Sequence, residues 1–291
     1  MGVKGVIVAA GYGSRFMPVT KTIPKEMLPL LNRPAISFIV EELEAAGIQD
    51  ILIITSRRKK ALDDYFDREV ELEQVFERDG KQAALNSIRP GSANVFFVRQ
   101  REMLGTGHAL LAARAFVGED PFVVAYPDDL FFGERGLSSE LVKVYQQTGD
   151  SVLAVQDLGD VDVSRYGVVD VGPSEGHSFP MRHIVEKPAP GREPSKMVSY
   201  GRYLFTADLF PLLEEGWRQF DAAGRPGEFY HIDAINSLAS QGKVRAYNYE
   251  GLRLDTGQIE GYLEAICRYA LKREDTAAFA RDLFLKLSRT D

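Results

Sequence analysis

The most informative part of the sequence is VKGVIVAAGYGSRFMPVTKTIPKEMLP, residues 3–29. It begins with a continuous apolar run, which is typical of a buried parallel strand. Gly11 and Gly13 follow at once, and the backbone N–H groups of such a loop can surround an anion. Arg15 and Lys25 add two cations that could reach the same phosphate. The stretch therefore predicts an α/β fold with a phosphate site at the end of its first strand.

Two better-known phosphate loops match this stretch poorly. The dinucleotide fingerprint needs a third glycine and then a helix, but Phe16 stands at that position and Pro18 follows. The P-loop needs a lysine directly after its last glycine, and none is there. The second predicted strand ends near Arg57 and Arg58 rather than at an acid, which disfavours NAD and leaves NADP open. On the glycines alone, an ordinary strand-to-loop turn also stays open.

Predicted strands and helices alternate along the first half of the chain. Strands are predicted at 5–10, 50–55, 94–98 and 121–129, and helices at 34–48, 60–66, 68–88 and 107–117. This alternation indicates a parallel sheet with helices on both faces. Ligands of such sheets bind beyond the carboxyl ends of the strands, where the sequence places Gly11, Gln100 and Asp128.

The second half is richer in strands, some of which we expect to be antiparallel. Strands are predicted at 151–158, 166–171, 182–187, 198–205 and 243–249, and helices from 207 and over 228–242. From Ile259 onward the pattern is helical. We find no internal repeat and no long linker, so we expect both halves to share one sheet.

Composition excludes several classes of protein. The 291 residues carry a net charge of −7, which argues against a nucleic-acid surface. The single cysteine, Cys267, excludes an intrachain disulfide and a cysteine-based zinc site. The apolar runs are too short for a membrane helix or a signal peptide, so we expect a cytoplasmic protein without membrane contact.

A family resemblance extends this interpretation. GYGSRFMPVTKTIPKEMLPLLNRP (11–34) closely resembles the signature loop of the sugar-1-phosphate nucleotidylyltransferases, and most of all that of the bacterial UTP–glucose-1-phosphate uridylyltransferases. The resemblance covers nearly the whole chain in the expected order. It continues in VRQREMLGTGHA (98–109), YPDDL (126–130), RYGVV (165–169), VEKP (185–188), YGRYLF (200–205) and LDTG (254–257).

The resemblance implies a fold and a division of the chain. The fold would be Rossmann-like and three-layered, with a central mixed, mainly parallel sheet flanked by helices and a small β-rich sugar-binding part. One nucleotidyltransferase domain would cover residues 1–291. It would contain a nucleotide-binding half (1–150), a sugar-phosphate-binding half (151–258) and a helical C-terminal tail (259–291). A homodimer or homotetramer is also implied, and the tail and the charged insert at 68–88 are available for subunit contacts.

The reaction implied is transfer of the uridylyl group of UTP to glucose 1-phosphate, giving UDP-glucose and pyrophosphate. The sugar phosphate is already an anion, so the task is to align two anions and neutralise developing charge. Arg15, Lys25 and Asp128 would be the catalytic residues. Asp128 and Asp255 would hold Mg²⁺, whose preferred ligands are carboxylate and phosphate oxygens.

The resemblance also assigns the two substrates. Nucleotide contacts would come from Ala10, Gly11, Gly13, Glu26, Gln100, Gly105 and Gly107. Sugar-phosphate contacts would come from Gly167, Glu186, Lys187 and Gly201. The Gln100 amide offers one donor and one acceptor to a uracil edge. Glu26 would contact the ribose or order the loop. Glu186 and Lys187 can share one ligand only where their strand ends or bends, as Pro188 allows.

Two segments depart from the uridylyltransferase pattern. GEFYHIDAIN (227–236) stands where the family reads closer to EIQLTDAI, and LDTG stands where it often has D-C-G. These departures leave dTTP or another nucleotide, and another sugar 1-phosphate, open as alternatives. A catalytically silent nucleotide-sugar sensor is disfavoured, because Arg15, Lys25 and Asp128 are all present. A dinucleotide-dependent oxidoreductase is the third hypothesis.

Overall fold

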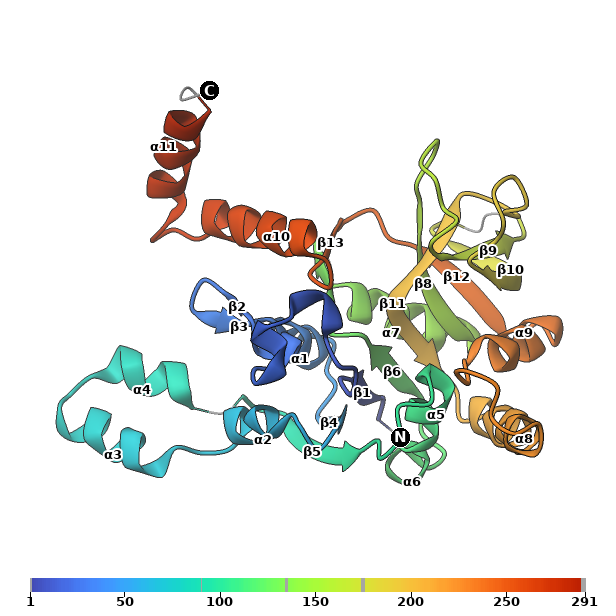
Figure 1. Ribbon diagram of the computed structural model, residues 1–291, viewed down its shortest axis with the longest axis horizontal. Helices are drawn as coiled ribbons and strands as arrows, with labels where there is room; N and C mark the ends of the chain where they lie inside the picture. Colours follow the sequence, from blue (N-terminus) through green and yellow to red (C-terminus); the bar gives the residue numbers. More distant parts are fainter. Residues whose placement is uncertain (1, 90, 134–135, 174–175, 289–291) are drawn as a thin grey trace.

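The computed structural model describes residues 2–89, 91–133, 136–173 and 176–288. Its centre is a nine-stranded sheet of order β5-β4-β1-β6-β11-β8-β12-β10-β9 (Figure 1). Four strands come from the first half: β1 (Lys4–Val8), β4 (Asp50–Thr55), β5 (Asn94–Arg99) and β6 (Phe122–Ala125). They pair in parallel, as the β-α alternation predicts.

The second half supplies β8 (Ser151–Asp157), β9 (Gly167–Val171), β10 (Ser178–Glu186), β11 (Met197–Phe205) and β12 (Val244–Asn248). β11 pairs with β6, so both halves share one sheet as expected. β11 also pairs with β9, which closes β11, β8, β12, β10 and β9 into a ring. This ring is the expected β-rich part.

The prediction of a mainly parallel sheet is correct only for the first half. Among the described residues, this sheet has nine strand pairings, of which four are parallel and five antiparallel. The reason lies in the connections, because short turn-rich links join β9, β10 and β11, and only antiparallel neighbours can be joined without a long crossover.

Helices cover both faces of the sheet, which gives the predicted three layers. On one face lie α5 (Thr106–Leu111), α6 (Arg114–Val117), α8 (Leu209–Ala222) and α9 (Ile232–Ser240). On the other lie α1 (Ala35–Ala45), α2 (Lys60–Phe66) and α7 (Leu137–Thr148). Neighbouring strand residues point to opposite faces, so Val6 joins the first core and Ile7 the second.

Three helix predictions need correction. The insert predicted as helical over 68–88 is two helices, at 70–78 and 82–88, joined by a turn at 79–81. The helix predicted over 107–117 is two helices, because the backbone tightens where Ala112 and Ala113 bond to carbonyls three residues back. The helix predicted over 228–242 begins only at Ile232. Phe229 instead donates to Leu104 O at 2.7 Å and accepts from Gly107 N at 2.9 Å, so its backbone groups serve another loop.

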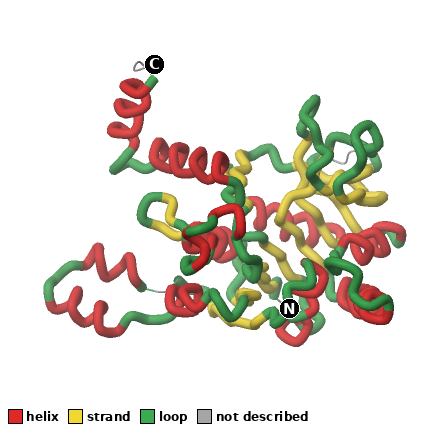
Figure 2. The backbone as a smooth tube through the Cα atoms, viewed as in Figure 1, coloured by secondary structure: helices red, strands yellow, loops and turns green. Residues whose placement is uncertain are grey.

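The remaining elements lie at the periphery. Helices α3 (Val70–Arg78) and α4 (Gln82–Ile88) form an excursion from the sheet, and α10 (Ile259–Lys272) and α11 (Ala277–Leu287) extend away from it on another side (Figure 2). Two small pairs complete the fold: β2 (Pro29–Leu30) with β3 (Arg33–Pro34), and β7 (Asp129–Phe132) with β13 (Leu252–Asp255). Among the described residues, no helix is long and apolar enough to cross a membrane.

Candidate active site

The glycine loop after β1 forms short 3-10 turns instead of a helix. These are η1 (Ser14–Phe16), η2 (Val19–Lys21) and η3 (Lys25–Met27). Gly13 is left-handed with φ 67°, and its carbonyl accepts from Thr20 Oγ1 at 2.7 Å. A Cβ atom on Gly13 would lie 3.3 Å from Lys25 Cβ. The loop thus folds back and brings Lys25 beside the glycines, as predicted.

Lys25 and Asp128 form the centre of the site. Lys25 Nζ lies 2.5 Å from Asp128 Oδ2. Burial disfavours the charge on both groups, but their mutual attraction prevails: the pKa of Lys25 is raised and that of Asp128 is lowered. Both are therefore charged at neutral pH. Arg15 lies close by, since its Nη1 donates to Gly257 O at 3.3 Å.

The β7–β13 pair brings the second carboxylate to Asp128. Asp255 lies opposite Asp129 in this antiparallel pair, and Thr256 N donates to Asp128 O at 2.8 Å. A Cβ atom on Gly257 would lie 2.7 Å from Asp128 Oδ2 and 3.1 Å from Asp255 Oδ1. The two carboxylates therefore flank one point, beside the backbone of Gly257.

These two carboxylates are a suitable donor set for Mg²⁺. Within the described residues, no group of three or more His, Cys, Asp or Glu side chains could hold a metal alone. Mg²⁺ is usually held by one or two carboxylates, with phosphate oxygens and water completing the shell. Asp128 and Asp255 fit that pattern, which needs a triphosphate to supply the other ligands.

Asp129 and Arg253 belong to the same cluster of charged residues, and the sequence analysis assigned a role to neither. Asp129 Oδ2 accepts from Gly201 N at 3.1 Å, and Oδ1 lies 2.5 Å from Arg253 Nη2. Arg253 Nη2 is also 3.8 Å from Asp255 Oδ2. Burial, helped by Asp128 and Asp255, raises the pKa of Asp129 against the opposing effect of Arg253. The only signals in sequence are the second acid of YPDD and the arginine between two leucines in LRLD.

Gln100 lies in the stretch predicted to recognise the base. It follows β5, is buried, and its Nε2 donates to Gly105 O at 3.2 Å. Gly105 has φ 100°, and a Cβ atom there would lie 2.5 Å from Phe229 O. A Cβ atom on Gly107 would lie 2.8 Å from Phe229 Cδ1. Both glycines are thus needed because residues 228–231 pass directly over this loop, which the sequence analysis did not foresee.

The other residues predicted to contact the nucleotide differ from one another in burial. Ala10 is buried just beyond the end of β1, and Gly11 after it is exposed. Both carboxylate oxygens of buried Glu26 accept from Lys59 Nζ, at 2.7 and 2.8 Å. Of the two roles predicted for Glu26, ordering of the loop therefore agrees with the geometry and a ribose contact does not. Lys59 was missed, because nothing in its local sequence marks it as buried.

Three of the four predicted sugar residues, Gly167, Glu186 and Gly201, line one cavity of about 290 Å³ together with Asp128. The fourth, Lys187, is not among its lining residues. Gly167, Glu186 and Gly201 come from β9, β10 and β11. A Cβ atom on Gly167 would lie 3.2 Å from Glu186 Oε2, so the glycine leaves room beside this carboxylate. Thr106, at the start of α5, lines the same cavity and joins it to the base-recognition stretch.

Glu186 and Lys187 are arranged as the sequence analysis required. Strand β10 ends at Glu186, and Lys187 adopts the left-handed conformation with φ 47°. The bend brings Lys187 Nζ to 3.6 Å from Glu186 Oε1. The two side chains therefore lie on the same side despite being adjacent in sequence.

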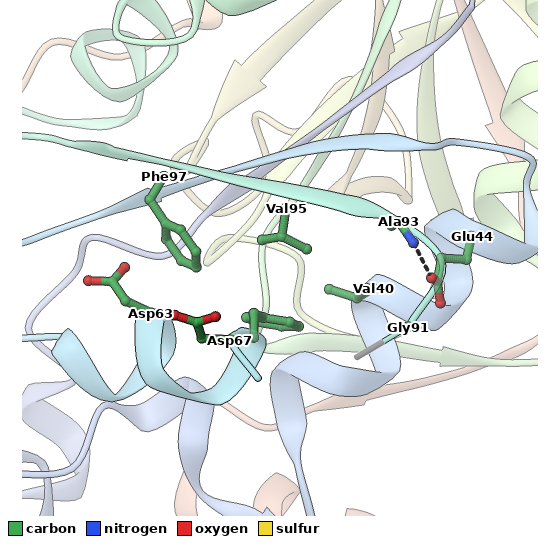
Figure 3. Close-up of a pocket in the computed structure, with 9 residues that line it drawn as sticks. Val40, Glu44, Asp63, Asp67, Gly91, Ala93, Val95 and Phe97 are labelled. Carbon is green, nitrogen blue, oxygen red and sulfur yellow. Dashed lines mark hydrogen bonds between the residues drawn. The ribbon is translucent and has the colours of Figure 1, made fainter. Parts of the chain in front are cut away.

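A second cavity, of about 360 Å³, lies elsewhere, between α1, α2 and β5 (Figure 3). Its polar lining includes Glu44, Asp63 and Asp67, and Glu44 accepts from Ala93 N at 2.7 Å. These carboxylates would repel phosphate. None of the predicted site residues lines this cavity, so we do not assign it to the reaction.

By fold and site the chain is a nucleotidyl transferase, since the model of the nucleotidyl transferase family matches residues 4–272. UTP–glucose-1-phosphate uridylyltransferase of Staphylococcus epidermidis is 42% identical over 286 residues, covering 96% of this chain and 98% of that protein. The chain belongs to the family of these uridylyltransferases.

Two solved structures agree with this placement. UTP-bound UGPase from Acinetobacter baumannii matches with a TM-score of 0.89 at 36% identity, covering 99% of this chain and 100% of that one. A UDP-glucose pyrophosphorylase complexed with UDP-glucose matches with a TM-score of 0.81 at 35% identity, covering 94% and 100%.

Proposed function

We propose that this protein transfers the uridylyl group of UTP to glucose 1-phosphate, giving UDP-glucose and pyrophosphate. The observation that carries the proposal is the convergence of Lys25, Asp128 and Asp255 at one point beside the sugar cavity. The uridylyltransferase relatives at about two-fifths identity over nearly the full length support the choice of UTP and glucose.

In the proposed reaction, a phosphate oxygen of glucose 1-phosphate attacks the α-phosphorus of UTP in line. The new phosphorus–oxygen bond forms as the bond to the bridging oxygen of pyrophosphate breaks, and pyrophosphate leaves with the electron pair. Arg15 and Lys25 bind the triphosphate and stabilise the charge that develops on the leaving group. Glu186 accepts from sugar hydroxyls, and Lys187 pairs with the sugar phosphate.

Mg²⁺ is part of the proposal. Asp128 and Asp255 would hold it, and when bound it would neutralise phosphate charge. Because Lys25 already contacts Asp128, we expect the lysine to turn toward the triphosphate when the substrates bind. Asp129 and Arg253 keep Asp255 and the Gly201 backbone in place, and both also line the sugar cavity.

The division of the chain follows from the same proposal. One domain contains a nucleotide-binding half (1–150), a sugar-phosphate-binding half (151–258) and a helical tail (259–291). Its support is that β6 and β11 join the two halves in one sheet, and that residues from both halves line the sugar cavity.

A substrate panel tests the proposal. Pyrophosphate release is measured for UTP, dTTP, ATP and GTP, each paired with the 1-phosphates of glucose, galactose and N-acetylglucosamine. We expect UTP with glucose 1-phosphate to give the highest kcat/KM. If another pair is as good, the assignment of substrates is wrong. Release from no pair would contradict the enzyme itself.

A further inference from the structure

We propose that His231 recognises the sugar, with its Nε2 atom hydrogen-bonding a hydroxyl group of the sugar 1-phosphate. The inference rests on the proposed function and deepens it, because it adds a specificity-determining residue outside the predicted set. His231 lies in GEFYHIDAIN, the segment that departs from the uridylyltransferase pattern.

The first observation is a buried polar atom without a partner. His231 is 5% exposed, and within the described residues its Nε2 makes no hydrogen bond. Its other nitrogen, Nδ1, lies 2.7 Å from Thr106 Oγ1, which fixes the ring. Buried polar atoms are nearly always hydrogen-bonded, so an unpartnered one requires an explanation.

The second observation is the position of the residue. His231 lines the same cavity as Gly167, Glu186 and Gly201, the residues assigned to the sugar. Tyr126 and Ser199 line it too, and among the described residues the hydroxyl oxygens of both are buried and make no hydrogen bond of normal geometry, although Tyr126 lies near Thr106 and Ser199 near Tyr203. A sugar suits these residues, because its several hydroxyl groups can form hydrogen bonds with several polar side chains at once.

The chemistry of the ring selects a hydroxyl over a phosphate. Burial lowers the pKa of His231 to about 4, so the ring is neutral at physiological pH. A neutral imidazole has one donor and one acceptor nitrogen. The Thr106 hydroxyl can donate a hydrogen bond to Nδ1 or accept one from it. A sugar hydroxyl can likewise donate to Nε2 or accept from it. Phosphate is better bound by cations such as Arg165 and Arg253, which line the same cavity.

Two variants separate the two nitrogens of the ring. His231→Asn keeps a polar atom near the position of Nδ1, for Thr106, and removes Nε2. His231→Gln is the matched control, because its amide reaches the position of Nε2. We expect His231→Asn to lower kcat/KM for glucose 1-phosphate about tenfold and to change KM for UTP less than twofold. His231→Gln should recover most of this loss.

Monodeoxy analogues of glucose 1-phosphate, one lacking each hydroxyl, identify the contact. For one analogue the effect of His231→Asn should disappear, because the partner hydroxyl is already absent. An equal loss for glucose 1-phosphate and every analogue would overturn the proposal, since it would indicate a structural role. No loss in His231→Asn would overturn it as well.

Nuclear magnetic resonance of the unaltered protein gives a test that depends on neither a variant nor turnover. With labelled histidine, the Nε2 resonance of His231 should shift on addition of UDP-glucose and stay in place with UDP. Equal shifts with both ligands would overturn the proposal. Absence of pyrophosphate release from any substrate pair would instead contradict the proposed function, so the two failures are distinguishable.

Discussion

At the scale of single residues, Lys25 and Asp128 are the pair that we propose carries the chemistry of the site. Burial disfavours the charged form of each group, but the two opposite charges attract each other over 2.5 Å. This attraction is the stronger effect, so each group stabilises the charged form of the other. The pKa of Lys25 is raised above 10.5 and that of Asp128 lowered below 3.8. The pair therefore stays charged from weakly acidic to weakly alkaline pH, where nucleotide phosphates are also charged.

Lys25→Ala should lower kcat by about 100- to 1000-fold, because a cation aimed at the developing charge is lost. The protein should still fold, as judged by circular dichroism and Tm. Lys243→Ala is the matched control, since Lys243 pairs with Asp208 at 2.7 Å on the surface. That variant should retain kcat within twofold. Unchanged turnover in Lys25→Ala would remove Lys25 from catalysis.

His231 predicts a pH dependence of stability. Its pKa is about 4 in the folded protein, below the ordinary value of 6.5. As pH falls between these values, the unfolded chain binds a proton that the folded chain excludes, so the free energy of unfolding decreases, by roughly 3 kcal/mol. Urea denaturation at several pH values should therefore show a shallower acid loss in His231→Asn. Identical slopes would contradict a neutral buried His231.

Residues named by motif and residues found in space differ in kind. Arg15, Lys25 and Asp128 could be proposed from sequence, because the chain repeats a known pattern around them. Lys59 and Arg253 could not, since their burial depends on partners 33 and 124 residues away. His231 stood in a segment marked as unusual, but its free nitrogen is visible only once the cavity is known.

At the scale of elements, one buried ion pair fixes the lysine loop. Glu26 in η3 and Lys59 before α2 are both buried, and the pair joins these two segments. Burial lowers the pKa of Lys59, and Glu26 acts against that shift. Since Glu26 directly follows Lys25, the pair holds the proposed catalytic lysine in position.

Lys59→Met should lower the free energy of unfolding by about 3–5 kcal/mol, because Glu26 would be left as a buried charge without a partner. Lys60→Met is the control: this neighbouring lysine is exposed, so the change should be within about 0.5 kcal/mol. Urea denaturation measures both. Similar values for the two variants would show that the buried pair does not stabilise the loop.

The loop before α5 depends on Gly105. Gly105→Ala should raise KM for UTP and lower the free energy of unfolding, because its Cβ would lie 2.5 Å from Phe229 O and would push residues 228–231 away. Gly149→Ala is the control, since Gly149 also has a positive φ, 75°, but a Cβ atom there would have no neighbouring atom within 4 Å. This variant should lower the free energy of unfolding by about 1 kcal/mol and leave KM for UTP unchanged. Equal KM values for UTP in both variants would contradict the role of this loop.

Local patterns predicted most elements well and failed where distant contacts decide. The spans of β4 (Asp50–Thr55) and α2 (Lys60–Phe66) agree with the predicted 50–55 and 60–66. The start of α9 was wrong, because Phe229 exchanges backbone hydrogen bonds with Leu104 and Gly107. Nothing in residues 228–231 alone reveals that exchange.

At the scale of the whole molecule, the sheet changes character between its halves. Helical crossovers keep the first half parallel, which the β-α alternation predicts. The ring of β11, β8, β12, β10 and β9 closes through the pairing of Val198 with Val168. Pairing between strands that are far apart in the chain leaves no periodic pattern in the sequence. The sequence therefore indicated that the second half is rich in strands, but not that these strands close into a ring. This ring supplies Gly167, Glu186 and Gly201 to the sugar cavity.

The helical tail predicts self-association. In α11, Phe279, Leu283 and Leu287 are spaced four residues apart and are 71%, 37% and 59% exposed. One exposed apolar face on a helix that extends from the body (Figure 1) suits a subunit contact. Sedimentation equilibrium should give a dimer or tetramer, and Phe279→Ser with Leu283→Ser should shift it toward monomer. Arg281→Ser is the control on the same helix and should leave the oligomeric state unchanged. A monomeric unaltered protein would contradict this prediction.

A labelling experiment that follows the α-phosphorus of UTP tests the proposed reaction. UTP labelled at that atom is incubated with glucose 1-phosphate, Mg²⁺ and the protein, with Lys25→Ala and Lys243→Ala in parallel. We predict that the label appears in UDP-glucose, with one pyrophosphate released for each, and that only Lys25→Ala slows the transfer, by about 100- to 1000-fold. Label that stays in UTP, or transfer that Lys25→Ala leaves intact, would contradict the proposed reaction at this site.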